Sequence, residues 1–75
     1  MNNQLKPLPL SEMPFVLLMF KSHGESDANE GVDMESGYSN AVEAISSHIG
    51  YNVHQQVFKS SYENAWRSIK HNKRA

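Results

Sequence analysis

The sequence predicts an all-α fold, a small domain of three helices, and three observations predict it. From Val53 to Arg74, at 100° per residue, apolar side chains fall within one arc of about 100° and basic side chains fill the neighbouring arc. Residues typical of helix starts and stops bound two further segments. With 75 residues, the chain is long enough for one domain with a small core.

The first helix is expected over residues 12–23. Ser11 is suited to the N-cap, Pro14 to the first turn and Gly24 to the C-terminal stop. The run Phe15–Phe20 is apolar at every position, so it could instead form a buried strand, which would make the fold α+β. The boundary signals favour the helix.

The second helix is expected over residues 40–49. Asn40 followed by Glu43 fits a capping box, and Gly50 supplies the C-terminal stop. Before this helix, residues 24–37 hold three glycines and five acids, a composition that predicts a long acidic loop.

The third helix is expected over residues 53–71. Asn52 followed by Gln55 is a weaker capping box, and the helix ends in cations that suit the negative end of its dipole. One arc of this helix is apolar and should face the core: Phe58, Tyr62, Ala65, Trp66 and Ile69. We expect Phe58 and Trp66 to meet the first helix at the centre of that core.

Residues 1–10 carry two prolines and no periodicity, which predicts a flexible, extended arm before a single helical domain of residues 11–75. The apolar run of the first helix is far shorter than the roughly 20 residues that span a bilayer, and no cleavage site follows it. The chain has no cysteine, which fits a reducing compartment. We therefore expect a cytoplasmic protein without membrane association.

Charge is strongly segregated along the chain although the net charge is only −1. Six acids and no Lys or Arg lie between Ser22 and Phe58, whereas five cations and one acid follow from Lys59 onward. This segregation favours a non-enzymatic regulator or inhibitor that binds a protein partner through charged surfaces. The candidate partner-binding residues are Lys59, Arg67, Lys70 and Arg74 on the basic side, and Asp27, Glu30 and Asp33 on the acidic side.

An alternative interpretation is a helix-turn-helix DNA-binding protein that uses residues 40–74. Gly50 would lie in the turn, and the start of the following helix would present its side chains to DNA. The candidate DNA-binding residues are His54, Gln55, Gln56 and Lys59. Against this interpretation, no Lys or Arg precedes Lys59 in the unit, so the leading turn would approach the phosphates without a cation.

A second alternative is a DNA-mimic inhibitor. The acidic segment 25–43 carries six carboxylates and no cation, so it could imitate the charge of a phosphate backbone and occupy a basic groove on another protein.

A further expectation concerns the apolar run Phe15–Phe20. Because this run has no polar side, we expect three short helices to leave part of it uncovered and the protein to homodimerise through it.

Catalysis and metal binding find little support. None of the serines lies in a nucleophile-elbow sequence, no glycine-rich phosphate loop is present, and no two histidines are spaced for one helix face. A calcium-loop pattern that starts at Glu25 misplaces the required glycine and the final Glu by one residue each. We expect no enzyme activity, no metal and no cofactor, with nucleic acid as the alternative ligand to a protein.

Overall fold

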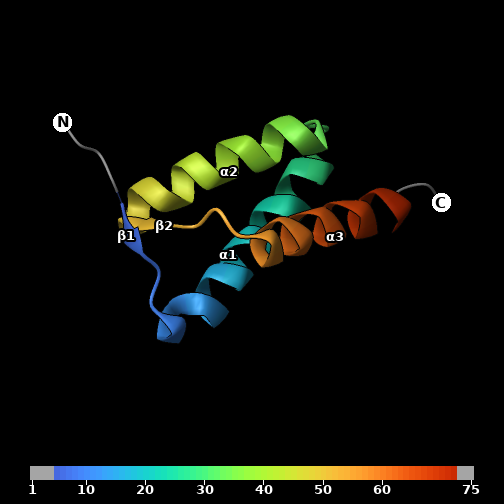
Figure 1. Cartoon of the computed structure of the whole chain (residues 1–75). Coiled ribbons are helices and arrows are strands. Elements are labelled where there is room, and N and C mark those ends of the chain that lie inside the picture. The colour runs from blue at the N-terminus through green and yellow to red at the C-terminus, as the bar shows by residue number, and fades with distance from the viewer. Residues whose placement is uncertain (1–4, 73–75) are drawn as a thin grey trace.

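Three α-helices form the body of the protein in the computed structural model, which describes residues 5–72 (Figure 1). The helices confirm the predicted all-α, three-helix fold. They are α1 (Met13–Asn29), α2 (Met34–Ile49) and α3 (Gln56–Asn72). Three shorter elements accompany them: strand β1 (Lys6–Pro7), the 3-10 helix η1 (Leu10–Glu12) and strand β2 (Tyr51–Asn52).

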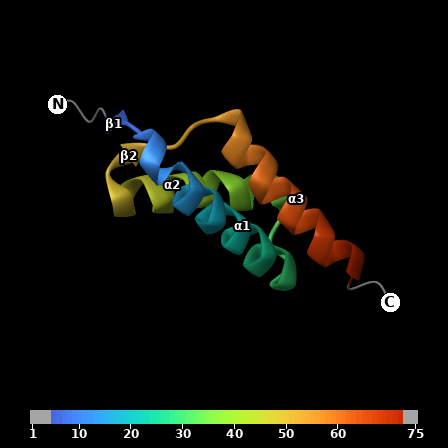
Figure 2. The same ribbon diagram turned by 90° about the horizontal axis from the view of Figure 1, so that it is seen from below.

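Helix α1 packs against both of the other helices, and its contact with α3 is the more extensive. The two helices run in the same general direction (Figure 2). Near their starts, the Ser61 hydroxyl donates to the Leu17 carbonyl at 3.2 Å. Beyond the C-terminal end of α1, the Trp66 indole N–H of α3 donates to the Val32 carbonyl at 2.9 Å. These two bonds fix the orientation of α3 relative to α1.

Residues Phe15–Phe20 are helical throughout, so the strand alternative for this run is wrong. Pro14 lies in the first turn of α1 as predicted. Ser11 does not cap the helix, because it lies within η1 and the N-cap position is occupied by Glu12. Two of the six side chains in this run, Phe15 and Leu18, are exposed, so local apolarity did not decide which side of the helix is buried.

Gly24 does not end the first helix, contrary to the prediction, and α1 continues to Asn29. Gly24 is buried against α3: a Cβ there would collide with the backbone oxygen of Tyr62 and lie 3.1 Å from the Cβ of Ala65. The glycine therefore serves close helix packing. The actual stop is Gly31, whose φ is 77°, in a Schellman turn in which the Val32 N–H bonds the Asp27 carbonyl at 2.8 Å.

The predicted acidic loop over residues 24–37 is wrong, since only residues 30–33 connect α1 to α2. Helix α2 begins at Met34 rather than at residue 40 because Asp33 caps it, accepting a hydrogen bond from the Ser36 N–H at 3.0 Å. Asn40 lies exposed within the helix. The predicted stop at Gly50 is confirmed, with φ of 77° and its N–H bonded to the Ser46 carbonyl at 2.8 Å.

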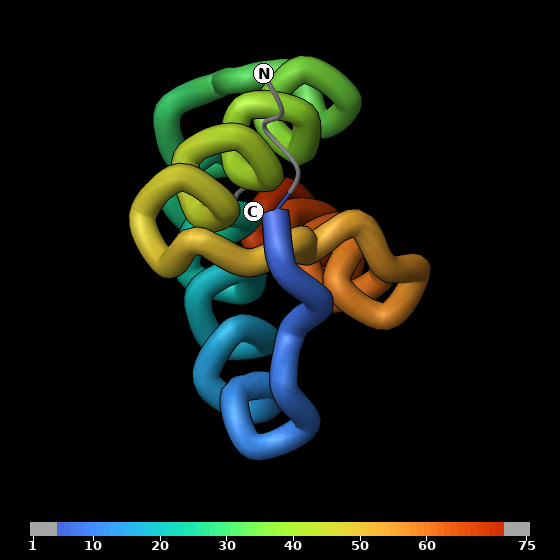
Figure 3. Tube along the Cα trace, turned by 60° about the vertical axis from the view of Figure 1, so that its left-hand side comes forward, coloured from blue at the N-terminus to red at the C-terminus, as the bar shows by residue number. Residues whose placement is uncertain are grey.

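Helix α3 begins at Gln56, later than predicted, because residues 52–55 form a turn in which the Gln55 N–H bonds the Val53 carbonyl at 3.0 Å, directly after a segment that pairs with the N-terminal arm. Strands β1 and β2 are parallel, with Lys6 opposite Tyr51, and Figure 3 shows the arm crossing this segment. The Asn52 side chain accepts from the His54 N–H at 2.9 Å, so it closes a turn ahead of the helix instead of capping it. The arm thus has a defined path from residue 5, and residues 1–4 of the predicted flexible arm lie outside the described part.

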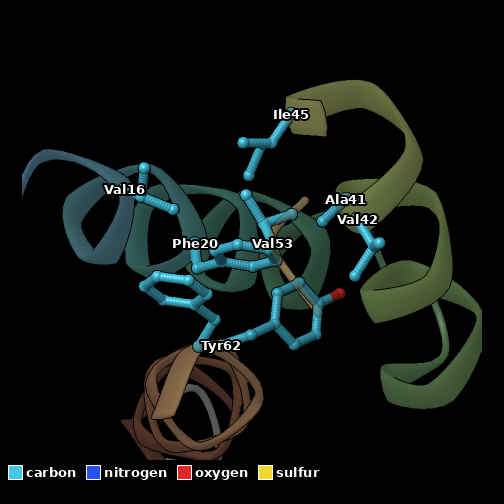
Figure 4. Packing of buried hydrophobic residues seen from close by; sticks show 8 residues of the cluster. Val16, Phe20, Ala41, Val42, Ile45, Val53 and Tyr62 are labelled. Carbon is cyan, nitrogen blue, oxygen red and sulfur yellow. The ribbon is translucent and has the colours of Figure 1, made fainter. Parts of the chain in front are cut away.

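The core is a cluster of aliphatic and aromatic side chains to which all three helices and Val53 contribute (Figure 4). The rings of Phe20 and Phe58 stack with centroids 5.3 Å apart, and Tyr38 packs edge-on against Tyr62 at 5.8 Å. Phe58 therefore lies at the centre, as predicted. Trp66 does not, because it is only partly buried at the edge of the cluster, and the second fully buried aromatic residue of α3 is Tyr62.

Candidate interaction surfaces

Asp27, a candidate partner-binding residue, is engaged inside the fold. Its carboxylate accepts a 2.5 Å hydrogen bond from the Tyr62 hydroxyl, which joins α1 to α3. Burial first, and then the hydrogen bond and the charge of Asp27, raise the pKa of Tyr62 well above its usual range. A Cβ at Gly37 would collide with the same hydroxyl, so the glycine on α2 makes room for this bond.

The other two acidic candidates lie in the connection between α1 and α2. Glu30 is exposed at the C-cap of α1, where no internal hydrogen bond of its side chain is seen among the described residues. Asp33 is also exposed, and its side chain caps α2. Of the three acids, Glu30 and Asp33 therefore present charge to solvent, while Asp27 mainly holds two helices together.

Three of the four basic candidates lie on α3. Lys59, Arg67 and Lys70 are all exposed and share one side of the helix at 100° per residue. Eleven residues separate the first from the last, which is about 16 Å along the axis. Glu63 interrupts the series, its carboxylate 3.9 Å from the guanidinium of Arg67. Arg74 lies outside the described residues.

Trp66 brings the acidic and the basic candidates together. Its indole N–H bonds the Val32 carbonyl, in the middle of the acidic connection, and the Lys70 ammonium lies 5.3 Å from the centroid of its ring. Trp66, Arg67 and Lys70 also line one shallow hollow. We use the term charged end for this surface, which comprises Glu30, Asp33, Trp66, Arg67 and Lys70.

The four candidate DNA-binding residues also come together. With Tyr38 of α2, they line one hollow at the start of α3: His54, Gln55, Gln56 and Lys59. The connection between α2 and α3 runs over residues 50–55, longer than the three- or four-residue turn usual in a helix-turn-helix. The structure therefore groups these side chains, although on a connection of a different form from the one expected.

Metal-binding geometry is not found within residues 5–72, where no three His, Asp or Glu side chains converge. The residues of the calcium-loop pattern are instead part of a helix. Glu25, Asp27 and Asn29 lie in α1, and the Asn29 amide donates to the Glu25 carbonyl at 3.1 Å.

Sequence reasoning identified the charged residues of the charged end but not their proximity. The signal for that proximity is absent from the local pattern, because Trp66 and Val32 are 34 residues apart and nothing in their sequence contexts pairs them. Tyr62 was likewise expected only as one member of an apolar arc. Its role became apparent only from the partner that its hydroxyl meets across the helix interface.

Comparison with known proteins found no matching family model, no matching curated protein and no matching solved structure. Over the part of the chain that the structure describes, no helix has the length and apolarity needed to cross a membrane.

Proposed function

We propose that this protein is a small non-enzymatic regulator or inhibitor that binds a protein partner through the charged end. The observation that carries the proposal is the hydrogen bond from Trp66 to the Val32 carbonyl, because it joins the acidic connection to the basic side of α3. The partly buried Trp66 thus contacts the acidic connection through its N–H and a cation through its ring. Trp and Arg are enriched among the residues that dominate binding energy at protein interfaces.

The mixture of charges favours a protein over a nucleic acid as the partner. A phosphate backbone that approached Arg67 and Lys70 would be repelled by the Glu63 carboxylate, 3.9 Å from the Arg67 guanidinium, and by the acids of the connection that Trp66 contacts. A protein surface can place opposite charges against both sets. Exposed charges of this kind mainly speed association and suppress wrong partners, so their removal should affect association rates and selectivity.

The test is affinity capture from a cell extract with immobilised wild-type protein, followed by measurement of the affinity for the captured protein. The variants are the pair Arg67→Glu with Lys70→Glu, and separately Glu30→Lys. We expect each to weaken the complex at least about tenfold. Ser60→Glu is the matched control, since it adds a charge at an exposed position on α3 away from the charged end. Circular dichroism would verify that every variant is folded.

Three results are informative. Loss of binding in both sets of variants supports the proposal. Loss only with Glu30→Lys would favour the DNA-mimic inhibitor, whose acidic segment now extends over α1, the connection and α2. No loss in either set would refute a role for the charged end.

DNA binding remains the second candidate, because its four residues line one hollow with Tyr38. It predicts that duplex DNA binds, by fluorescence anisotropy, with an affinity that falls steeply between about 50 and 200 mM salt. It also predicts that Gln56→Ala reduces sequence preference more than stability. An absence of binding at the lower salt concentration would remove this candidate and leave the protein partner.

A further inference from the structure

A shallow hollow near the C-terminal end of α3 combines an apolar surface with a basic rim. Four side chains line it: Trp66, Arg67, Lys70 and His71. They share one facet of the helix, because residues three or four positions apart are neighbours on a helix surface. The indole ring and the aliphatic stems of Arg67 and Lys70 make the hollow mostly apolar. The facet is about 7.5 Å long at 1.5 Å per residue, which is enough for one side chain and one polar group of a ligand.

Lys70 is held at this hollow by the tryptophan ring. Its ammonium lies 5.3 Å from the ring centroid of Trp66, within the range of a cation–π interaction. The ring is itself fixed, because its N–H donates to the Val32 carbonyl at 2.9 Å. A cation that is already positioned loses less side-chain entropy when it binds a ligand than a freely rotating lysine would. The hollow thus offers an apolar surface and a positioned positive charge in one place.

The charge around the hollow matches one negative charge rather than a run of them. Arg67 and Lys70 supply two positive charges, but the Glu63 carboxylate lies 3.9 Å from the Arg67 guanidinium and offsets one of them. The neutral imidazole of His71 adds a hydrogen-bond donor without adding a charge. A phosphate backbone or a polyacidic segment would carry further negative charges towards Glu63 and the acidic connection. A ligand with one carboxylate beside an apolar group carries no such excess.

We propose that the hollow binds the C-terminal residue of a protein partner, and that this residue has an aliphatic side chain such as that of Leu. The inference rests on the proposed function, since it names the part of the partner that meets the charged end. The aliphatic side chain packs on the ring of Trp66, and the terminal carboxylate accepts hydrogen bonds from Arg67 and Lys70.

A chain terminus fits this hollow better than an internal acidic residue does. Its carboxylate and its side chain are attached to one Cα, so both groups reach a facet of this length together. An internal Asp or Glu needs a second residue for the apolar contact. Its chain also continues on both sides, towards Glu63 or the acidic connection, whereas a terminus stops at the hollow.

The first test is a titration of the full chain with short peptides, followed by tryptophan fluorescence. Trp66 is the single tryptophan of the chain, so its emission reports on the hollow directly. The probes are N-acetyl-Gly-Gly-Leu with a free C-terminal carboxylate and the same peptide as a C-terminal amide. The free carboxylate should bind with a dissociation constant of about 1–10 mM, and the amide at least about fivefold more weakly. Equal binding of the two peptides, or no change in emission with either, would overturn the proposal.

Variants distinguish the hollow from general charge attraction. Arg67→Gln and Lys70→Gln should each weaken binding of the free-carboxylate peptide about threefold or more. The matched control is Lys59→Gln, which removes an exposed cation from the same side of α3 outside the hollow and should bind the peptide like the wild type. All three side chains are exposed, so the variants should fold normally, and circular dichroism verifies this. If Lys59→Gln weakened binding as much as Lys70→Gln, the proposed site would be wrong.

A third peptide tests the source of the carboxylate. N-acetyl-Leu-Gly-Glu as a C-terminal amide carries its carboxylate on an internal side chain and should bind at least about threefold more weakly than the free terminus. Binding as tight as that of the free terminus would contradict the assignment to a chain end. If no peptide binds while Arg67→Glu with Lys70→Glu still weakens a captured partner, this inference alone fails. If the peptides bind and a captured partner is insensitive to that charge reversal, the proposed function alone fails.

Discussion

Gly24→Ala tests the packing of α1 on α3, because two effects of the added methyl group oppose each other. In an exposed helix, replacing Gly with Ala stabilises the protein by about 1 kcal/mol. Here the new Cβ would collide with the backbone oxygen of Tyr62 and lie 3.3 Å from the backbone nitrogen of Trp66. Backbone atoms in the middle of a helix cannot rotate away, so α1 and α3 would have to separate.

The expected magnitude follows from these contacts. Inserting a methyl group into a packed interface typically costs about 1–3 kcal/mol, and more where backbone must move. Because backbone has to move here, the cost should lie at the upper end of that range, about 3 kcal/mol. After subtraction of the gain of about 1 kcal/mol in helix propensity, we expect a net loss of about 2 kcal/mol. For a chain of this length the whole free energy of unfolding is about 4–11 kcal/mol, and each kcal/mol lost lowers Tm by roughly 4–8 °C.

The assay is thermal and urea unfolding followed by circular dichroism. Ser22→Ala, at an exposed position on the same helix, is the control and should change the free energy of unfolding by less than about 0.5 kcal/mol. If Gly24→Ala were as stable as the wild type or more so, the close approach of the two helices would be refuted.

Three further predictions concern the helix junctions and the core. Tyr62→Phe should cost about 1.5–3 kcal/mol, since it removes a hydrogen bond to a carboxylate. Because the pKa of Tyr62 is raised in the folded state from 10.0, wild-type stability should be complete below pH 10 and fall above it, by up to about 1.4 kcal/mol per pH unit. In urea unfolding at several pH values, the free energy of unfolding of Tyr62→Phe should fall less steeply with pH than that of the wild type. An equal slope in both proteins would contradict the raised pKa. Asp33→Ala should lower the free energy of unfolding, measured in urea, by about 1 kcal/mol, because it removes the cap of α2. The control Asn40→Ala should change it by less than about 0.5 kcal/mol. A larger loss for Asn40→Ala than for Asp33→Ala would place the start of α2 at residue 40. Trp66→Ala should lower the free energy of unfolding by about 2–3 kcal/mol, less than the roughly 3–5 of a fully buried Trp, and a melting temperature equal to that of the wild type would argue against its packing and its bond to Val32.

The local sequence pattern predicted a helix correctly where one of its sides is consistently apolar, or where only one nearby residue is suited to end it. The buried side of α3 was evident from the spacing of Phe58, Tyr62 and Ala65, and Gly50 was the sole glycine near the end of α2. The sequence also contained every charged residue of the charged end. These properties depend on residues that are close in the chain, so periodicity and capping chemistry reveal them.

Tertiary structure decided which of several residues with the same local propensity actually ends a helix and which serves another role. Gly24 and Gly31 are both plausible helix stops, and only the contact between Gly24 and the backbone of Tyr62 shows that the first serves packing and the second serves the turn. The proximity of Trp66 to the acidic connection, and the exposure of Phe15 and Leu18, likewise depend on where α3 lies across α1. The physical reason is that a local sequence fixes the chemistry of each helix face, whereas the partner of each face is chosen by how the whole chain buries its apolar surface.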